Sequence, residues 1–219
     1  MTQSMEILLA TGKFSPAPII GVAGLMGSGK DAVAKIIAEE YEAKIIRFAD
    51  PVYEAAKRLD PYVIYDASPM RLMDLIEKIG WDKAKRTIFE VRRLLQVIGT
   101  ECGRQIHGDD CWVRLAADKI RDLYKYNPDN SQRCNVDCIV IPDVRFYNEA
   151  HFVKTAGLEV LYVERPSLTE DSPEMQHISE QHGKELKPLC RIIRNNGTLD
   201  DLRAKVLKIV GRHLKTAPK

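Results

Sequence analysis

The segment Gly24-Leu25-Met26-Gly27-Ser28-Gly29-Lys30-Asp31 restricts what this chain can fold into more than any other stretch. It has the spacing G-x-x-x-x-G-K, in which glycines let backbone N–H groups turn toward a phosphate and the lysine reaches the phosphoryl group. An apolar run at 19–23 precedes it, and Val33, Ile36 and Ile37 follow at helical spacing. Strand, loop and helix therefore stand in the order that a phosphate-binding loop requires.

This loop predicts a nucleotide-binding site with Mg²⁺. The residues expected to bind the nucleotide, which the resemblance described below implies to be ATP as phosphoryl donor, are Met26, Gly27, Ser28, Gly29, Lys30 and Asp31. Asp31 replaces the Ser or Thr that usually ligates magnesium in such loops, and a carboxylate can hold Mg²⁺ directly or through a water. A plain glycine turn between two core elements would explain the glycines but not a lysine at this position.

Four further apolar runs predict the rest of a sheet: 43–49, 138–141, 159–163 and 190–194. Helical patterns separate these runs, which indicates βαβ units and a parallel sheet with right-handed crossovers. In such sheets ligands bind at the carboxyl ends of the strands. Functional residues are therefore expected just after each run.

Composition excludes several classes of protein. The formal charge of +2 is the difference between 33 basic and 31 acidic residues in a chain of 219, so no overall field favours nucleic acid or a membrane. No signal peptide or run of 18 apolar residues is present, and we expect a cytoplasmic protein, in a host cell if viral. The cysteines fit no zinc or C-x-x-C spacing, which favours idle thiols: Cys102, Cys111, Cys134, Cys138 and Cys190.

A helix is predicted from Arg86 to Gly99, preceded by a helical insertion in which Ser68-Pro69 begins a helix that ends at Gly80. One stripe of the predicted helix carries two arginines, an amide and a hydroxyl: Arg92, Arg93, Gln96 and Thr100. No Glu or Asp lies on this stripe. It is therefore either a solvated face or a clamp for a phosphate and a base.

Beyond the insertion, polar residues follow the later strands. Asp143 lies where a Walker-B aspartate would face magnesium, although it could instead cap a helix, and Arg145 could reach the same pocket. Arg165 begins a polar stretch without regular period, residues 165–187, which predicts a lid. Trp112 either fills the core or stacks on a base.

Several segments together resemble the bacteriophage deoxynucleoside monophosphate kinases of the T-even type. They are Gly29-Lys30-Asp31, Phe48-Ala49-Asp50-Pro51, Arg92-Arg93-Leu94-Leu95-Gln96-Val97-Ile98-Gly99-Thr100, Trp112-Val113, Pro142-Asp143-Val144-Arg145, Val163-Glu164-Arg165-Pro166 and His177-Ile178-Ser179-Glu180. Two positions depart from the family pattern: Ala32 stands where we expect threonine, and Tyr53 where we expect lysine.

The resemblance implies a three-layer α/β/α P-loop fold with a five-stranded, mainly parallel sheet of order 2-3-1-4-5. Residues 1–17 would be a lead-in and 18–219 the kinase domain, with a monophosphate-binding insertion at about 51–108 and the lid at about 165–187. The implied reaction is ATP + dNMP → ADP + dNDP. The expected catalytic residues are Lys30, Arg93, Arg145 and Arg165. ATP would also contact Arg165. The metal ligands would be Asp31 and Asp143. The substrate contacts would be Asp50, Arg92, Arg93, Gln96, Thr100, Trp112, Arg145, His177 and Glu180.

Two alternatives stay open. One is another small-molecule kinase of the P-loop type, similar to dephospho-coenzyme A kinases. The other is a regulatory or nucleic-acid-binding ATPase of the P-loop type. For the kinase we expect a deoxynucleoside monophosphate as partner and no direct contact with nucleic acid, and a homodimer is compatible with the sequence.

Overall fold

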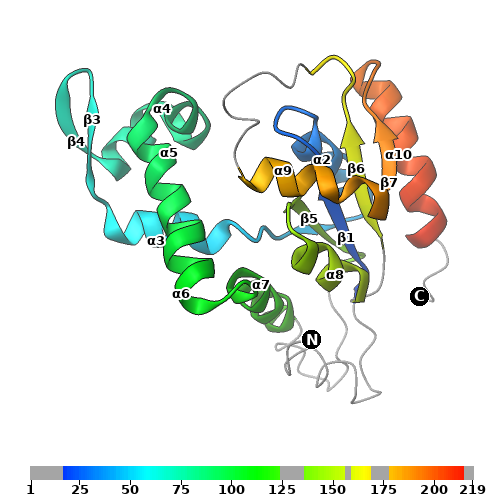
Figure 1. The fold of residues 1–219 in the computed structure, drawn as a ribbon. Coiled ribbons are helices and arrows are strands. Elements are labelled where there is room, and N and C mark those ends of the chain that lie inside the picture. Colours follow the sequence, from blue (N-terminus) through cyan, green and yellow to red (C-terminus); the bar gives the residue numbers. More distant parts are fainter. Residues whose placement is uncertain (1–16, 124–135, 156–158, 169–177, 215–219) are drawn as a thin grey trace. The chain divides into compact units, whose positions relative to one another are not determined.

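A computed structural model describes residues 17–123, 136–155, 159–168 and 178–214 (Figure 1). The chain divides into two compact units. The first, here the sheet unit, comprises Met1–Phe48 and Ala116–Lys219; the second, the inserted unit, is Ala49–Leu115. The predicted lead-in, apart from Ala17, lies outside the described residues.

The sheet unit is built on a sheet of five strands within the described part of the chain. The strands are β1 (Ile19–Ala23), β2 (Lys44–Ile45), β5 (Ile139–Val144), β6 (Val160–Glu164) and β7 (Arg191–Arg194). They lie in the order β2-β5-β1-β6-β7, and each neighbouring pair is parallel. Counted along the chain this order is 2-3-1-4-5, so the predicted parallel sheet and its strand order are confirmed.

Helices cover both faces of the sheet. On one face, α2 (Lys30–Glu40) and α10 (Leu199–Leu214) share a core with side chains that alternate along the central strands, among them Ile20, Val22 and Val140. On the other face, α8 (Tyr147–Thr155) brings Val153 against Gly21. The layers are therefore helix, sheet and helix, and the P-loop joins β1 directly to α2.

The second strand is shorter than predicted. Only Lys44–Ile45 form β2, and one further ladder bond runs from the Ile46 N–H to the Val140 carbonyl. The chain then leaves the sheet, because the Phe48 N–H donates to the carboxylate of Asp143 instead of to a strand (3.1 Å). The apolar residues Ile46 and Phe48 are buried all the same, which is why the sequence read as a longer strand.

The inserted unit contains helices and one hairpin. Its elements are α3 (Asp50–Leu59), β3 (Tyr62–Tyr65), β4 (Ser68–Arg71), α4 (Leu72–Thr87), α5 (Phe89–Gln96), the π-helix η1 (Val97–Arg104), α6 (Gln105–His107) and the first turn of α7 (Cys111–Asp122). It has its own core, centred on Ala56, Leu72, Leu75, Ala84 and Val91, each fully buried. A separate core explains why these residues form a compact unit.

The predicted start of a helix at Ser68-Pro69 is wrong, since both residues lie in β4. Asp66 and Ala67 adopt left-handed backbone angles (φ 50° and 60°), as a two-residue hairpin turn requires. Asp-Ala is an unusual pair for such a turn, which hid the hairpin in the sequence. Helix α4 begins only after the hairpin and continues past Gly80, where a non-helical residue (φ 76°, ψ 157°) kinks it.

The helix predicted from Arg86 to Gly99 is also different. Ile88 is extended and separates α4 from α5, and α5 continues into the π-helix through Arg104. The indole N–H of Trp112 donates to the Gly99 carbonyl (2.8 Å), and its ring lies against Gly103. A π-helix changes which residues share a face, so side chains beyond Gln96 leave the stripe that an α-helix would give.

The region after β6 is more regular than predicted. Residues 178–185 form α9 (Ile178–Glu185), and Lys187–Leu189 form one 3₁₀ turn, η3, although the sequence predicted no regular period here. Residues 169–177 lie outside the described part. Within the described ranges, no helix is long and apolar enough to cross a membrane.

Candidate active site

The loop between β1 and α2 has a backbone that only glycine can supply at two points. Gly24 has φ 136°, and a Cβ there would lie 2.5 Å from the Val163 carbonyl oxygen. Gly29 has φ 105° and precedes the first residue of α2. Both angles fall in the left-handed region that side chains disfavour. The glycine spacing in the sequence therefore has a conformational cause.

Lys30 lies folded over this loop. Its ammonium donates to the carbonyl oxygens of Gly24 (2.6 Å) and Leu25 (2.7 Å). The loop backbone thus holds a positive charge at the N-terminal end of α2, where the helix dipole already favours an anion. A phosphate placed here would meet both.

Ser28 supplies an independent sign that the loop binds a ligand. Its hydroxyl is fully buried and has no hydrogen-bond partner among the described residues. An unsatisfied buried hydroxyl costs about 1–3 kcal/mol, and such groups in native proteins call for an explanation. The first turn of α2 likewise has no side-chain cap. The Ser28 hydroxyl and the uncapped N–H groups at the start of α2 are hydrogen-bond donors that the phosphates of a nucleotide could satisfy.

Asp31 is paired with a residue that the sequence did not single out. The Arg47 guanidinium donates to the Asp31 carboxylate (3.1 Å), and the Asp31 side chain is 83% exposed. Arg47 follows β2, so it reaches the loop from the carboxyl end of the neighbouring strand. The predicted ligand of magnesium therefore has an exchangeable cationic partner.

Asp143 and Arg145 lie at the carboxyl end of β5. Asp143 accepts the Phe48 N–H and so fixes the chain after β2. At the start of the helix that follows β5, the buried carboxylate of Glu149 accepts the backbone N–H groups of Arg145 (2.7 Å) and Phe146 (3.1 Å). The metal role of Asp143 and its capping alternative both stay predictions.

Asp31 and Asp143 offer two carboxylates, which is the number that a magnesium site of this kind usually takes from the protein. No group of three or more His, Cys, Asp or Glu side chains that could hold a metal occurs in the part of the chain that the structure describes. Mg²⁺ in phosphoryl-transfer sites usually takes one or two carboxylates and fills its shell with phosphates and water. Asp31 and Asp143 fit that sparse donor set, whereas a complete protein cage is absent from the described ranges.

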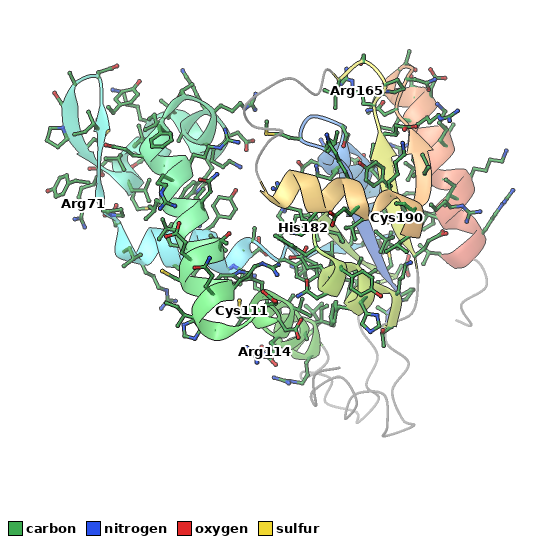
Figure 2. All side chains as sticks on the ribbon, in the orientation of Figure 1. Arg71, Cys111, Arg114, Arg165, His182 and Cys190 are labelled. Carbon is green, nitrogen blue, oxygen red and sulfur yellow. The ribbon has the colours of Figure 1, made fainter. Side chains whose placement is uncertain are left out.

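The segments after β6 and β7 also reach the loop. The guanidinium of Arg165, which is labelled in Figure 2, lies 3.5 Å from the Gly27 carbonyl oxygen. Leu168 lies over Gly27. From the end of β7, the side-chain amide of Asn195 donates to the Ser28 carbonyl (2.8 Å). The loop is thus held from both later strands.

The predicted lid residues are only partly described. His177 lies outside the described residues, and Glu180 belongs to α9, with its side chain outside the description. His182 on the same helix, labelled in Figure 2, is hydrogen-bonded to Glu185 (3.0 Å). Its ring packs against that of Phe146, with ring centres 5.4 Å apart. Helix α9 is therefore docked next to Arg145.

In the inserted unit, the premise that the arginine stripe lacks acidic partners is wrong. Arg93 forms an ion pair with Glu101, which the π-helix carries into reach. Arg92 is half-buried and also has a partner. Gln96 ends α5, and Thr100 lies in the π-helix, so the α-helical spacing that joined them does not hold.

The other predicted substrate contacts of this unit have structural partners too. Trp112 is partly buried in the core and bonded to Gly99, as the core interpretation predicted. Asp50 is the first residue of α3. Tyr53, where we expected lysine, accepts a hydrogen bond from Lys85 (2.9 Å). Burial alone would lower the pKa of Lys85, but its bonds to Tyr53 and Asp82 outweigh burial and raise it.

The cysteines agree with the prediction of idle thiols as far as they are described. Burial raises the pKa of Cys138 to about 12 and that of Cys190 to about 11, and Cys111 shifts in the same direction. Cys102 is exposed, and Cys134 lies outside the described residues. Thiols with raised pKa values carry little thiolate at neutral pH and are poor nucleophiles.

Three residues at the site were missed in the sequence: Arg47, Glu149 and Asn195. Arg47 and Asn195 follow strands, so the rule that ligands meet strand ends could have found them. Arg47 was hidden inside the overlong second strand, and Asn195 was read only as part of the turn before Gly197. Glu149 carries no signal beyond its place in the first turn of a helix.

Comparisons with known proteins agree on one relationship. The sequence profile of the deoxynucleotide monophosphate kinase family matches residues 62–206. A protein of Acanthamoeba polyphaga mimivirus, named as a predicted deoxynucleotide monophosphate kinase, is 28% identical over 207 residues, which cover 88% of this chain and 95% of that protein. The deoxynucleoside-5'-monophosphate kinase of Escherichia phage T5 is 29% identical over 62% of this chain and 71% of its own.

The deoxynucleotide monophosphate kinase of Enterobacteria phage T4 is 29% identical over 118 residues, 54% of this chain and 44% of that protein. Among solved structures, the dephospho-CoA kinase from Campylobacter jejuni aligns over 90% of this chain and 97% of its own, with 14% identity and a TM-score of 0.47, a likeness too distant to carry a conclusion. The match of the family profile spans more than half of the chain, and with it the chain belongs to the deoxynucleotide monophosphate kinase family.

Proposed function

We propose that this protein transfers the γ-phosphoryl group of ATP to a deoxynucleoside monophosphate and releases ADP and a deoxynucleoside diphosphate. The observation that carries the proposal is the loop of Gly24 to Lys30, with its glycine-only backbone, its inward lysine and the unsatisfied hydroxyl of Ser28. Family membership supplies the class of acceptor.

The donor side of the reaction follows from the loop. Backbone N–H groups of the loop and of the first turn of α2 would bind the phosphates, and Lys30 would exchange its two carbonyl partners for a phosphoryl oxygen. Asp31 and Asp143 would hold Mg²⁺, which neutralises charge on the phosphates when bound. Positioning and electrostatic stabilisation carry this kind of transfer, so no general base is required.

Three arginines would neutralise the remaining charge. Arg165 begins the proposed lid, next to the loop carbonyl of Gly27. The backbone of Arg145 is held by a hydrogen bond from its N–H to the carboxylate of Glu149. We assign Arg93 to the acceptor phosphate, in exchange for its partner Glu101. Closure of the lid, with His177 and Glu180, would exclude water and suppress hydrolysis of ATP.

The inserted unit would bind the acceptor. It supplies Asp50, Arg92, Arg93, Gln96 and Thr100. Arginine can grip a phosphate with two parallel hydrogen bonds, and the amide of Gln96 has both a donor and an acceptor for a base edge. Because its indole N–H is bonded to the Gly99 carbonyl, we assign Trp112 a structural role in this unit and not stacking on the base.

The test is turnover in a coupled assay that measures ADP release with ATP and each deoxy- and ribonucleoside monophosphate in turn. We expect turnover with at least one deoxynucleoside monophosphate and none with DNA alone. Turnover with DNA alone would favour the regulatory ATPase. Failure with every monophosphate, in a protein that binds ATP, would favour another small-molecule kinase.

A further inference from the structure

Asn195 contacts the phosphate loop from the far end of the chain. It follows β7, and its side-chain amide donates to the Ser28 carbonyl (2.8 Å), a contact between residues 167 positions apart. The N–H of Ser28 is bonded in turn to the Leu25 carbonyl (3.1 Å). The N–H and the carbonyl of Ser28 are thereby both fixed, and they flank the side chain whose hydroxyl is buried and unpaired.

The same amide explains why residue 29 carries no side chain. A Cβ at Gly29 would lie 2.6 Å from the amide nitrogen of Asn195, closer than such atoms approach in proteins. The loop and Asn195 therefore occupy adjoining volumes, and a change at one is felt at the other. Gly29 is also the residue at which the loop becomes α2.

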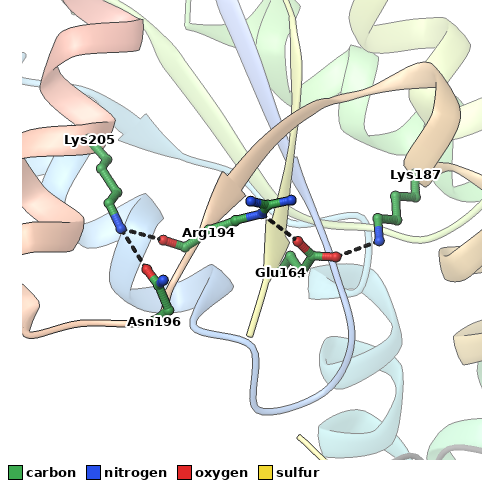
Figure 3. A network of polar contacts seen from close by, with 5 residues as sticks. All are labelled: Glu164, Lys187, Arg194, Asn196 and Lys205. Atoms are coloured by element: carbon green, nitrogen blue, oxygen red, sulfur yellow. Dashed lines mark hydrogen bonds and ion pairs between the residues drawn. The ribbon is translucent and has the colours of Figure 1, made fainter. Parts of the chain in front are cut away.

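Asn195 is itself held by the sheet. Its backbone N–H donates to the Glu164 carbonyl (2.7 Å), at the end of β6. The carboxylate of Glu164 accepts Lys187 (2.5 Å) and Arg194 (3.2 Å), as Figure 3 shows. These cations hold the pKa of Glu164 below its usual value, Lys187 first, so the carboxylate is charged at neutral pH.

The next residue takes no part in this contact. The side chain of Asn196 accepts Lys205 (2.8 Å), which also donates to the Arg194 carbonyl (2.9 Å; Figure 3). Two asparagines in one turn thus point to different partners. Of these two asparagines, Asn195 is the one that is bonded to the loop.

We propose that Asn195 is a positioning residue of the donor site: it holds the phosphate loop in the shape that receives ATP, and it acts through Ser28 and Gly29 rather than on the substrate. The proposal rests on the proposed function. A loop ordered in advance loses less conformational entropy when it binds, so the effect falls on donor affinity.

The experiment compares Asn195→Ala with the control Asn196→Ala. ADP affinity is measured by calorimetry without turnover, and KM is measured for ATP and for the monophosphate. For Asn195→Ala we expect ADP affinity and the KM for ATP to worsen about 3- to 10-fold, the scale of one lost hydrogen bond, with the KM for the monophosphate unchanged. Asn196→Ala should match the parent protein.

Equal ADP affinity in Asn195→Ala and Asn196→Ala would overturn the proposal, as would equal weakening of ATP and monophosphate in Asn195→Ala. If Asn195→Ala does not fold, Asn195→Asp keeps the size but loses the donor, and parent-like ADP affinity in that folded variant would overturn it too. Failure of the parent protein to bind ADP at all would instead contradict the proposed function.

A double variant sharpens the test. Gly29→Ala should bind ADP poorly, through both its backbone angle and its collision with Asn195. Adding Asn195→Ala removes the collision, so the combined loss should be smaller than the product of the two single losses. Simple multiplication of the losses would show that the two residues act independently and would contradict the proposal.

Discussion

The two units present their polar residues in different ways. In the sheet unit, the candidate site residues come from the end of one strand after another: Gly24 after β1, Arg47 after β2, Asp143 at the end of β5, Arg165 after β6 and Asn195 after β7. A parallel sheet gathers its carboxyl ends at one edge, so residues far apart in sequence meet without any local signal.

In the inserted unit, by contrast, the contacts described above for Arg93 and Trp112 are local in sequence. Arg93 pairs with Glu101, eight residues on, and Trp112 bonds to Gly99, thirteen residues back. Both contacts use residues of the π-helix. Topology therefore constrains the donor site strongly, whereas the acceptor assignment depends on irregular local geometry.

The largest expected effect tests the sheet unit. Lys30→Met should leave a folded protein whose turnover falls by about 10²- to 10³-fold, because a preorganised charge at the transferred phosphoryl group is lost. Steady-state kinetics of ADP release measure this. Lys35→Met is the matched control, since Lys35 lies on the same helix, is 77% exposed and pairs only loosely with Glu39 (3.8 Å). Equal kcat in both variants would remove Lys30 from the mechanism.

The sequence predicted the sheet unit well, because its signals are strong and simple. A run such as 138–141 is buried on both faces and reads as continuous apolar sequence, and the spacing from Gly24 to Lys30 reflects backbone angles that the structure shows. The Thr198 and Asp201 side chains form a reciprocal cap of α10, which is a pattern of the S/T-x-x-E/D kind that can be recognised in sequence.

The inserted unit could not be predicted to the same depth. The Asp66-Ala67 turn uses left-handed angles without glycine, and the kink at Gly80 lies inside a helix that continues beyond it. The π-helix has no sequence pattern of its own, and it is what brings Glu101 to Arg93. The turn, the kink and the π-helix are backbone conformations that depend on tertiary packing, so the local sequence did not predict them.

The second prediction asks whether the acceptor site is in the inserted unit. Gln96→Ala should change relative kcat/KM among the bases by about 1–3 kcal/mol, the scale of a lost polar contact to a base. Arg93→Ala should weaken every monophosphate alike and leave the KM for ATP within a small factor. Kinetics across all deoxynucleoside monophosphates measure both.

Glu101→Gln separates binding from folding at this position. It removes the ion pair of Arg93 but keeps the arginine, so the KM for the monophosphate should be at or below that of the parent protein. If Glu101→Gln and Arg93→Ala behave alike, the pair serves the fold. Loss of ATP binding in Arg93→Ala would move the arginine to the donor site.

The third prediction tests the packing of the inserted unit. Gly103→Ala would place a Cβ 2.2 Å from the Trp112 ring, which its bond to Gly99 holds in place, so overpacking should destabilise this unit by about 1–3 kcal/mol. Gly99→Ala is the control, because a Cβ there meets Val52 at an ordinary 3.8 Å. Chemical denaturation measures both, and equal stability would contradict the packing.

The fourth prediction concerns the metal. Asp143→Asn keeps an oxygen that can accept the Phe48 N–H but removes the charge, so the fold contact should survive. The Mg²⁺ concentration for half-maximal rate should rise about 10-fold, as for other groups close to a metal. A magnesium titration of turnover measures this. If neither the Mg²⁺ midpoint nor the stability of the protein changes, Asp143 does not bind the metal, and its role is to accept the hydrogen bond from the Phe48 N–H.

The smallest expected effect is a shift in the Mg²⁺ midpoint when Arg47 is replaced. If Asp31 holds magnesium, Arg47 competes for the same carboxylate, and Arg47→Met should lower the Mg²⁺ midpoint, opposite in sign to Asp143→Asn. The shift should be no more than about 5-fold, because an ion pair this exposed contributes about 0–1 kcal/mol. For the same reason the melting temperature should not move, and Arg47→Lys, which keeps the charge, should lie close to the parent protein. A higher Mg²⁺ midpoint in Arg47→Met would mean that Arg47 supports the bound nucleotide instead of competing for Asp31, and the donor site would then hold one more cation than the sequence predicted.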